Sequence, residues 1–336
     1  MHIVSCGVDI AKNVFQLYGI DEEGNELRRR LKRTQLLRFF NQLEPCLVGL
    51  EACGGAHYWS RELGKLGHTV SLIAPQKVKP YVQGNKTDAN DAEGIHAALL
   101  RPGMKRVSPK TTEQQDLLML HRIRSLAVKT RTALANQIRG LLAEYGVVLP
   151  KRVATLRRRL VEVLAEDERV SVIAREQLHG LYEELLHQDD RIKRQEALIH
   201  QACQGNPACR RLLGIPGIGP LTATALIASA GDVSVFRNGR EFAAWLGIVP
   251  RQHSSGDKTM LQGISKRGDA YLRTLLVHGA RAVLSRAKGK EDRNSQWLVA
   301  LEARRGYNKA CVAQANKTAR IAWALMRYET RYQVAA

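Results

Sequence analysis

The hydrophobic periodicity of this 336-residue chain changes near residue 105, and that change does most to limit its fold. Before it, short apolar runs alternate with stretches of helical spacing, which is typical of an α/β domain with a mixed sheet. After it, apolar residues recur at steps of three and four over long stretches, which predicts helices. We therefore expect an α/β N-terminal domain followed by a mainly helical remainder.

Five segments of the first hundred residues have the composition and patterning of β-strands. They are residues 3–10, 14–18, 26–33, 47–50 and 69–74. A tight connection joins the first two segments, as in a hairpin. Helical spacing between and after the later strands predicts helices over residues 58–66 and 88–100.

Residues 110–202 contain two stretches whose apolar side chains fall on one helical face. The apolar positions are Leu120, Ile123, Leu126, Leu134, Ile138, Leu141 and Tyr145, then Leu178, Leu181, Leu185, Ile192 and Ile199. Gly146 and Pro150 interrupt the pattern between them. This arrangement is compatible with an antiparallel helical hairpin, an intermolecular coiled coil or an ordinary helical packing layer.

Positive charge is distributed unevenly along the chain. The net charge of +20 divides into +1 for residues 1–100, +11 for 101–160, −5 for 161–200 and +13 for 201–336. Lys and Arg side chains that neutralise phosphates release counterions, so an excess of this size favours a nucleic-acid partner. For any single cluster, a solvated helix face is an equally good explanation.

Composition disfavours several classes of protein. No run approaches the 18 consecutive apolar residues of a membrane span, and the N-terminus lacks the pattern of a secretory signal. The six cysteines form no CxxC pair and no zinc-binding spacing. They are expected to be free thiols in a cytoplasmic protein.

Four carboxylates occupy positions from which they can converge. Asp9 ends the first predicted strand, Glu51 directly follows a later strand, and Asp88 and Asp91 share one face of a helix. If the two strands are neighbours, all four can meet, and hard cations would have to offset their repulsion. The set predicts a Mg²⁺ site, with Mn²⁺ as an alternative, and two ions about 4 Å apart would support phosphodiester displacement. Taken singly, each Asp is also explained as a helix N-cap and Glu51 as a solvated strand end.

The segment Gly217-Ile-Gly219-Pro-Leu-Thr-Ala223 has the form of a helix-hairpin-helix turn. Glycine lets the backbone approach a phosphate, and the following helix offers free N–H groups. Turns of this kind also serve simply to cap helices. Gly217 and Gly219 are therefore candidates for nucleic-acid contact.

Two adjacent serines, Ser254 and Ser255, lie in a loop-like stretch, residues 250–258, with basic residues on both sides. A serine that attacks a phosphodiester needs nearby positive charge and a route for its proton. The charge can come from Arg251, Lys258 and Lys266, and the route from His253. Chemistry alone nevertheless favours a plain surface turn here.

Motifs that occur in order along nearly the whole chain give it a specific family resemblance. They are Val8-Asp9-Ile-Ala-Lys12, Leu50-Glu51-Ala-Cys-Gly-Gly55, Ala74-Pro75, Lys86-Thr-Asp88-Ala-Asn-Asp91-Ala92, Gly214-Ile-Pro-Gly-Ile-Gly219, Trp245-Leu-Gly-Ile-Val-Pro250, Ser255-Gly256, and Lys266-Arg-Gly268 leading into Leu272-Arg273. Together they resemble the DEDD-type transposases of the insertion-sequence 110 family and its 1111 subgroup. Only the helical middle is matched by pattern alone.

The resemblance implies three regions. Residues 1–105 would form a RuvC-like (RNase H-type) nuclease domain, 106–204 a coiled-coil linker and oligomerisation region, and 205–336 a C-terminal transposase domain. The four acidic residues of the nuclease domain would be Asp9, Glu51, Asp88 and Asp91. The C-terminal domain would carry a nucleophilic serine, which matches Ser255 better than Ser254. Arg251, Lys258, Lys266 and Arg273 join the two glycines as expected nucleic-acid contacts.

Members of this family excise and insert their element and use an element-encoded bridge RNA to select DNA. The implied partners are donor and target double-stranded DNA, the guide RNA and further protomers in a dimer or tetramer, without a membrane. The implied location is the nucleoid in a prokaryotic cytoplasm.

Three other functions stay open. A Holliday-junction resolvase or structure-selective nuclease would need the acidic cluster without the serine. An actin-like kinase would use Gly7-Val-Asp9, although the glycine and hydroxyl that would cradle phosphates are missing. A non-catalytic DNA-binding protein would need only the helix-hairpin-helix.

Overall fold

The computed structural model describes residues 2–85, 87–256 and 258–333. The chain divides into two compact units, which are Met1–Thr112 with Ala230–Val235, and Glu113–Ser229 with Phe236–Ala336. Lys86 of the acidic motif and Asp257 beside Ser255 lie outside the described residues. The long helices and the C-terminal region fall in the same unit, so the boundary expected at residue 204 stays a prediction.

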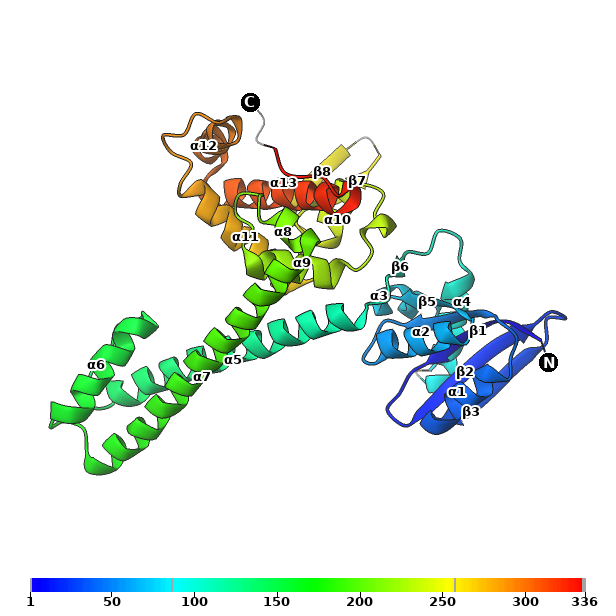
Figure 1. The fold of residues 1–336 in the computed structure, drawn as a ribbon, viewed down its shortest axis with the longest axis horizontal. Helices are drawn as coiled ribbons and strands as arrows, with labels where there is room; N and C mark the ends of the chain where they lie inside the picture. Colours follow the sequence, from blue (N-terminus) through cyan, green and yellow to red (C-terminus); the bar gives the residue numbers. More distant parts are fainter. Residues whose placement is uncertain (1, 86, 257, 334–336) are drawn as a thin grey trace. The chain divides into compact units, whose positions relative to one another are not determined.

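The first unit is built on a six-stranded mixed sheet in the order β3-β2-β1-β4-β5-β6 (Figure 1). Its strands are β1 (Ile3–Asp9), β2 (Val14–Asp21), β3 (Glu26–Lys32), β4 (Leu47–Glu51), β5 (Thr69–Ile73) and β6 (Arg106–Val107). β1, β2 and β3 form an antiparallel meander, β4 and β5 run parallel to β1, and β6 is antiparallel to β5. The expected mixed α/β sheet is confirmed, and only the two-residue β6 was missed.

Helices cover both faces of this sheet. They are α1 (Leu36–Asn41), α2 (Ala56–Lys65), α3 (Pro75–Val78) and α4 (Asp88–Leu100), with short 3-10 turns η1 (Arg33–Gln35) and η2 (Lys79–Tyr81). One core joins Val8 and Phe15 of the sheet to α1 and α2 through side chains such as Trp59. A second core on the opposite face joins Ile73 to α4 through Ile95. The α4 face is the one that carries the acidic residues.

The second unit is mainly helical (Figure 1). Its elements are α5 (Thr112–Ala143), α6 (Val153–Glu166), α7 (Val172–Gly205), α8 (Pro207–Leu212), α9 (Pro220–Ala230), α10 (Gly239–Trp245), β7 (Pro250–Ser255), β8 (Lys258–Ile264), α11 (Ala270–Leu284), α12 (Arg293–Arg305) and α13 (Tyr307–Tyr328). The turn η3 (Val233–Val235) belongs to the first unit. Among the described helices, none combines the length and apolar composition that a bilayer-spanning segment requires.

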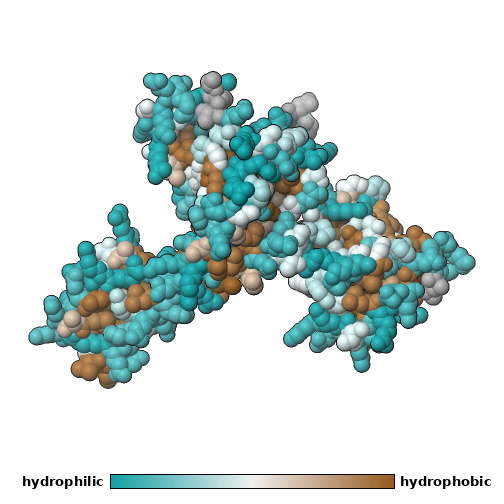
Figure 2. Space-filling model, viewed as in Figure 1, coloured by the Kyte–Doolittle hydropathy of each residue, from teal (hydrophilic) through white to brown (hydrophobic). Residues whose placement is uncertain are grey.

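The two longest helices, α5 and α7, lie antiparallel. Arg124 of α5 pairs with Glu196 of α7 at 2.6 Å, whereas Arg131, further along α5, pairs with Asp189, earlier in α7, at 3.1 Å. Apolar side chains of α5, α6 and α7 form one core. Figure 2 shows apolar residues gathered at the end of the long helices where α6 lies. Of the arrangements expected for residues 110–202, this is the antiparallel hairpin.

The apolar pattern predicted through α5 and the turn after it is wrong at three positions. Leu126, Leu141 and Tyr145 are 61%, 44% and 36% exposed. The buried face instead follows Ala127, Leu134, Ala135, Ile138 and Leu142. Because a helix has 3.6 residues per turn, residues spaced seven apart shift gradually around it. On a long helix the buried position therefore moves to a neighbouring residue.

The stretch expected to be a loop around Ser255 is a β-hairpin. β7 and β8 pair antiparallel, with Ser255 opposite Lys258. Every residue of β7, and every residue of β8 before Ile264, is exposed. Because the hairpin buries neither face, it lacks the apolar alternation by which strands are predicted.

Candidate active site

Asp9 and Glu51 end two neighbouring parallel strands. β1 pairs with β4, and the last residues in register are Val8 and Leu50. Asp9 and Glu51 are the residues that follow this pair, so they leave the sheet at the same edge. The condition on which the predicted convergence depended, that these strands be neighbours, is therefore met.

Asp88 and Asp91 lie in the first turn of α4. The N-cap of this helix is Thr87, whose side chain accepts a hydrogen bond from the Asn90 backbone N–H at 3.2 Å. The explanation of Asp88 as the N-cap is therefore wrong. Both carboxylates sit where the positive end of the helix dipole stabilises negative charge, and their side chains remain available to a ligand.

Gly7 allows α4 to reach the acidic strand end. A Cβ atom at position 7 would lie 2.5 Å from the backbone nitrogen of His96 and closer still to the Ala92 carbonyl oxygen. His96 also forms a hydrogen bond through Nε2 with Ser5 Oγ at 2.9 Å. This close packing brings the first turn of α4 over Asp9. Sequence reasoning had linked Gly7 only to the kinase alternative, because its role depends on a helix distant in sequence.

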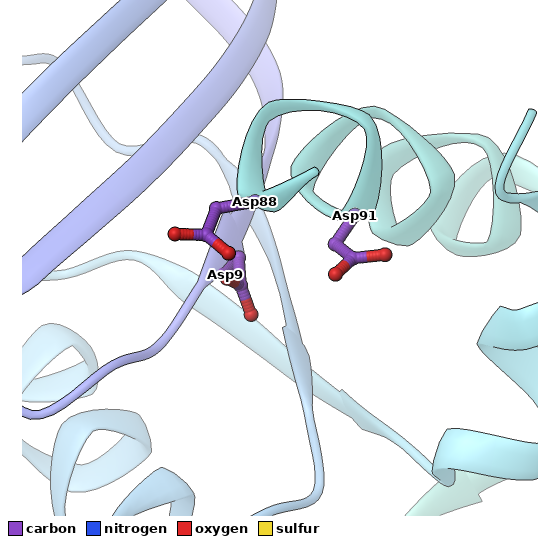
Figure 3. A group of neighbouring side chains, drawn as sticks. All are labelled: Asp9, Asp88 and Asp91. Atoms are coloured by element: carbon purple, nitrogen blue, oxygen red, sulfur yellow. The ribbon is translucent and has the colours of Figure 1, made fainter. Parts of the chain in front are cut away.

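Three of the four predicted carboxylates meet. Ligand oxygens of Asp9, Asp88 and Asp91 all lie within 4.8 Å of one another, and Figure 3 shows them coming from the end of β1 and the start of α4. Glu51 is not a member of this close group. Its negative charge nevertheless reaches Asp9, where it contributes to a raised pKa.

Electrostatics at the cluster favour a bound cation. Burial, followed by the charges of Asp91, Asp88 and Glu51, raises the pKa of Asp9 to about 6. The same negative field raises the pKa of the neighbouring Cys53 thiol, after the effect of burial. A set of oxygen ligands that repel one another fits a hard divalent metal ion, which would offset the repulsion.

The hairpin separates the two candidate serines onto opposite faces, because side chains alternate along a strand. Ser255 shares its face with Lys258, which is directly opposite, and with His253, which pairs with Met260. Ser254 pairs with Thr259 and accepts a hydrogen bond from Gln252 Nε2 at 2.9 Å. Of the basic and titratable groups named from the sequence, His253 and Lys258 thus lie on the Ser255 face.

Two glycine-containing motifs interlock at the base of the hairpin. Gly247 and Gly268 both have positive φ, and a Cβ atom on either would overlap the backbone of the other segment. Lys266 lies between them in the left-handed region, with φ of 54°, and donates its backbone N–H to the Gly247 carbonyl at 3.1 Å. Arg273 Nη1 donates to the Leu246 and Arg267 carbonyls at 3.1 and 3.3 Å. Arg273 therefore has a positioning role that the sequence did not reveal.

The glycines of the expected helix-hairpin-helix turn have different surroundings. Gly217, with φ of 86°, packs against Gly279 of α11, and a Cβ atom there would lie 2.8 Å from the Gly279 carbonyl oxygen. At Gly219, a Cβ atom would meet no described residue within 4 Å apart from its own chain neighbours. Packing thus explains Gly217, and phosphate contact by either glycine stays a prediction, as it does for Arg251 and Lys258.

Comparison with known proteins covers both units. The model of the Transposase IS116/IS110/IS902 family matches residues 209–296, and a transposase model of the IS110 DEDD type matches residues 6–147. A probable family 20 transposase of Pseudomonas aeruginosa is 51% identical over 336 residues, which cover 99% of each chain. The transposase for insertion sequence element IS1111A of Coxiella burnetii is 48% identical, covering 98% of this chain and 91% of that protein. The transposase for IS1328 of Yersinia enterocolitica is 41% identical over 96% of each chain.

This chain belongs to the IS110 family of transposases. The family resemblance inferred from the motifs is confirmed, and with it an enzyme that acts on DNA. The DEDD-type match to this transposase spans all four carboxylates, and the second match spans the hairpin with Ser255. The carboxylate set and the DEDD-type match together indicate a divalent metal ion in this transposase.

Proposed function

We propose that this transposase cleaves and exchanges DNA strands at a metal site formed by Asp9, Glu51, Asp88 and Asp91. The observation that carries the proposal is the convergence of three carboxylates within 4.8 Å, with the charge of Glu51 close by. In this proposal the carboxylates bind Mg²⁺, and Mn²⁺ is the alternative ion. A divalent cation there would stabilise negative charge on the scissile phosphate and the leaving oxygen.

The test is strand cleavage of DNA that carries the element ends, with Mg²⁺, Mn²⁺ or Ca²⁺ added. Asp9→Asn, Asp88→Asn and Asp91→Asn should each abolish cleavage and weaken Mn²⁺ binding, while salt-sensitive DNA binding persists. Glu51→Gln should likewise lower cleavage and Mn²⁺ affinity. Cleavage at the wild-type rate by any Asp variant would remove that residue from the site.

Ser255 is the nucleophile in this proposal. Its hydroxyl oxygen would attack phosphorus to form a phosphoserine ester, while the DNA oxygen leaves with its bond electrons and takes up a proton. Lys258 and His253 on the same hairpin face support Ser255 over Ser254. Conserving the phosphodiester energy in this ester permits rejoining to a second DNA strand.

Trapping of the covalent protein–DNA adduct tests which serine is the nucleophile. Wild-type protein, donor DNA, metal and guide RNA should give a protein–DNA adduct whose peptide contains modified Ser255. Ser255→Ala should abolish the adduct, and Ser254→Ala should retain it. A Ser255→Ala protein that still resolves branched DNA but forms no adduct would favour the junction-resolving nuclease.

The regional and partner assignments belong to the same proposal. Residues 106–204 would join protomers through a coiled coil, and the turn between α8 and α9 would act as a helix-hairpin-helix. An element-encoded RNA would guide the enzyme, and the net charge of +20 supports polyanionic partners. Sequencing of RNA that copurifies with the protein tests the guide RNA. The mass of the complex in solution tests the assembly of protomers.

A further inference from the structure

α4 covers only part of the sheet face on which Asp9 lies. Residues paired across β1, β2 and β3 share a face, and Gly7, Tyr18 and Arg28 form one such row. Tyr18 is 7% exposed with its ring 5.2 Å from that of His96, and Arg28 pairs with Glu93 of α4 at 3.0 Å. The protein itself therefore fills this row.

The adjacent row contains Asp9, Gln16 and Arg30, and beyond it Val14 pairs with Lys32. Val14 and Gln16 are half-buried, whereas Arg30 and Lys32 are exposed. These rows stay open because α4 begins at Asp88, above Asp9. The result is an open shelf of sheet, formed by Gln16, Arg30 and Lys32, directly beside the carboxylates.

Charge on the shelf complements a nucleic-acid backbone. Among the residues that the structure describes, the ion pairs of β3 are those of Arg28, with Glu26 and Glu93. The charges of Arg30 and Lys32 thus remain available to an anion. A phosphodiester strand is repelled by the carboxylate cluster, so cations beside the cluster are needed to hold it there.

The spacing also fits. Neighbouring strands lie about 4.8 Å apart, so the backbone of Arg30, two strands from Asp9, is about 10 Å away on the same face. A strand of a duplex rises about 3.4 Å per nucleotide along the axis, but its phosphates lie further apart in space because the backbone winds around that axis, so this separation is about two nucleotides.

We propose that this shelf binds the sugar–phosphate backbone of the DNA strand to be cleaved, about two nucleotides from the scissile bond. Arg30 and Lys32 neutralise phosphates, and the Gln16 amide donates a hydrogen bond to the same backbone. All three are positioning residues. This assignment rests on the acidic site described under the proposed function, since the shelf would place DNA for that site.

The strand provides its own matched control. Arg29 is adjacent to Arg30 and is also exposed, but its side chain is on the opposite face because of strand alternation. That face carries Leu27, which belongs to the core under α1 and α2. If a phosphate binds on the shelf, Arg30→Gln should weaken DNA binding and Arg29→Gln should not.

The experiment compares wild-type, Arg30→Gln, Lys32→Gln and Arg29→Gln full-length proteins on element-end DNA. Arg30→Gln and Lys32→Gln should raise KM about tenfold and leave kcat and Mn²⁺ affinity near wild type. Each should also lower the slope of log K against log salt by about one unit. Equal losses for Arg29→Gln and Arg30→Gln would overturn the proposal.

A change in the DNA locates the contact. Neutral methylphosphonate linkages placed one at a time along the strand should weaken wild-type binding about tenfold at one or two positions, about two nucleotides from the cut. Arg30→Gln should be insensitive to that same linkage, because the charge pair is already broken. Arg30→Gln sensitivity equal to that of wild type at every position would overturn the contact.

DNA binding measured in Ca²⁺ keeps this test separate from the proposed chemistry. If Asp9→Asn cleaves normally, the acidic site is wrong, yet the salt slopes still report on the shelf. If Arg30→Gln weakens guide RNA binding and leaves DNA binding unchanged, the shelf binds RNA and the proposal is wrong.

Discussion

Gly7 of β1 and His96 of α4 pack backbone against backbone, so that a Cβ atom at position 7 would lie 2.5 Å from the His96 nitrogen. This contact fixes how closely α4 approaches the strand that ends in Asp9. Two of the metal-site carboxylates are on the first turn of α4, so the geometry of the cluster depends on the absence of a side chain at position 7.

Gly7→Ala should therefore displace α4 and weaken metal binding. Overpacking of this kind costs about 1–3 kcal/mol in the free energy of unfolding. We expect a drop in thermal stability and at least a tenfold loss of Mn²⁺ affinity, measured by calorimetry. Gly64→Ala in α2 is the control, because outside that helix's own backbone a Cβ atom there would contact none of the described residues within 4 Å. An unchanged Mn²⁺ affinity in Gly7→Ala would show that the packing does not set the site.

Asp9→Asn should stabilise the metal-free protein. Because the folded-state pKa of about 6 exceeds the ordinary 3.8, ionisation of Asp9 opposes folding. Stability of the metal-free protein thus falls as pH rises from about 4 to about 6, and Asp9→Asn should recover about 1–3 kcal/mol at pH 8. Added Mg²⁺ should raise the melting temperature of the wild type only. Thermal unfolding at several pH values, with and without Mg²⁺, measures both effects, and a less stable metal-free Asn variant at pH 8 would contradict the argument.

His121 should make the second unit sensitive to acid. It is 3% exposed, shares hydrogen bonds with Thr224 Oγ1 at 2.9 Å and with the Tyr271 hydroxyl at 3.0 Å, and has a pKa lowered to about 4, chiefly by burial. The unfolded chain takes up a proton below about 6.5, whereas the folded state does not until about 4. The free energy of unfolding should fall by about 3 kcal/mol as pH drops from 6.5 to 4. His121→Asn should flatten this pH dependence in denaturant titrations, even if it lowers stability overall, and a slope equal to that of wild type would contradict the assignment.

Arg273→Lys should weaken the base of the β7–β8 hairpin. The lysine side chain is shorter and lacks the rigid planar guanidinium whose Nη1 donates to both the Leu246 and Arg267 carbonyls. We expect a loss of about 1–2 kcal/mol in stability, as for other hydrogen bonds from charged groups, and slower formation of the serine adduct. Arg286→Lys, at an exposed position after α11, should change neither. If Arg273→Lys lowers DNA affinity alone and leaves stability intact, the residue is a nucleic-acid contact instead.

The elements that build the acidic site were predictable because each has a strong local signal. Leu47–Glu51 is a short apolar run buried on both faces, and Thr87 is a good N-cap before a helical pattern. The spacing of Asp88 and Asp91 then follows from helix geometry. The role of Gly7 could not be predicted, because it depends on where α4 crosses β1.

Prediction from the sequence failed where the burial of side chains does not follow the local apolar pattern. The β7–β8 hairpin has no buried face, so its polar sequence predicts a loop instead. β6 is two residues long and is defined only by its pairing with β5. On α5, Leu126 and Leu141 fit an apolar repeat, but Leu141 is exposed and its neighbour Leu142 is buried in the core formed with α6 and α7.

The exposed hairpin has a consequence for control of the reaction. A two-stranded hairpin with both faces in water is only marginally stable by itself, because backbone hydrogen bonds alone hold it. Ser255, near its tip, is therefore held by the pairing of the two strands and by the packed glycines at the base alone. Under the proposed serine mechanism, the hydroxyl would be oriented for attack in a complex in which DNA or another chain covers one face of the hairpin.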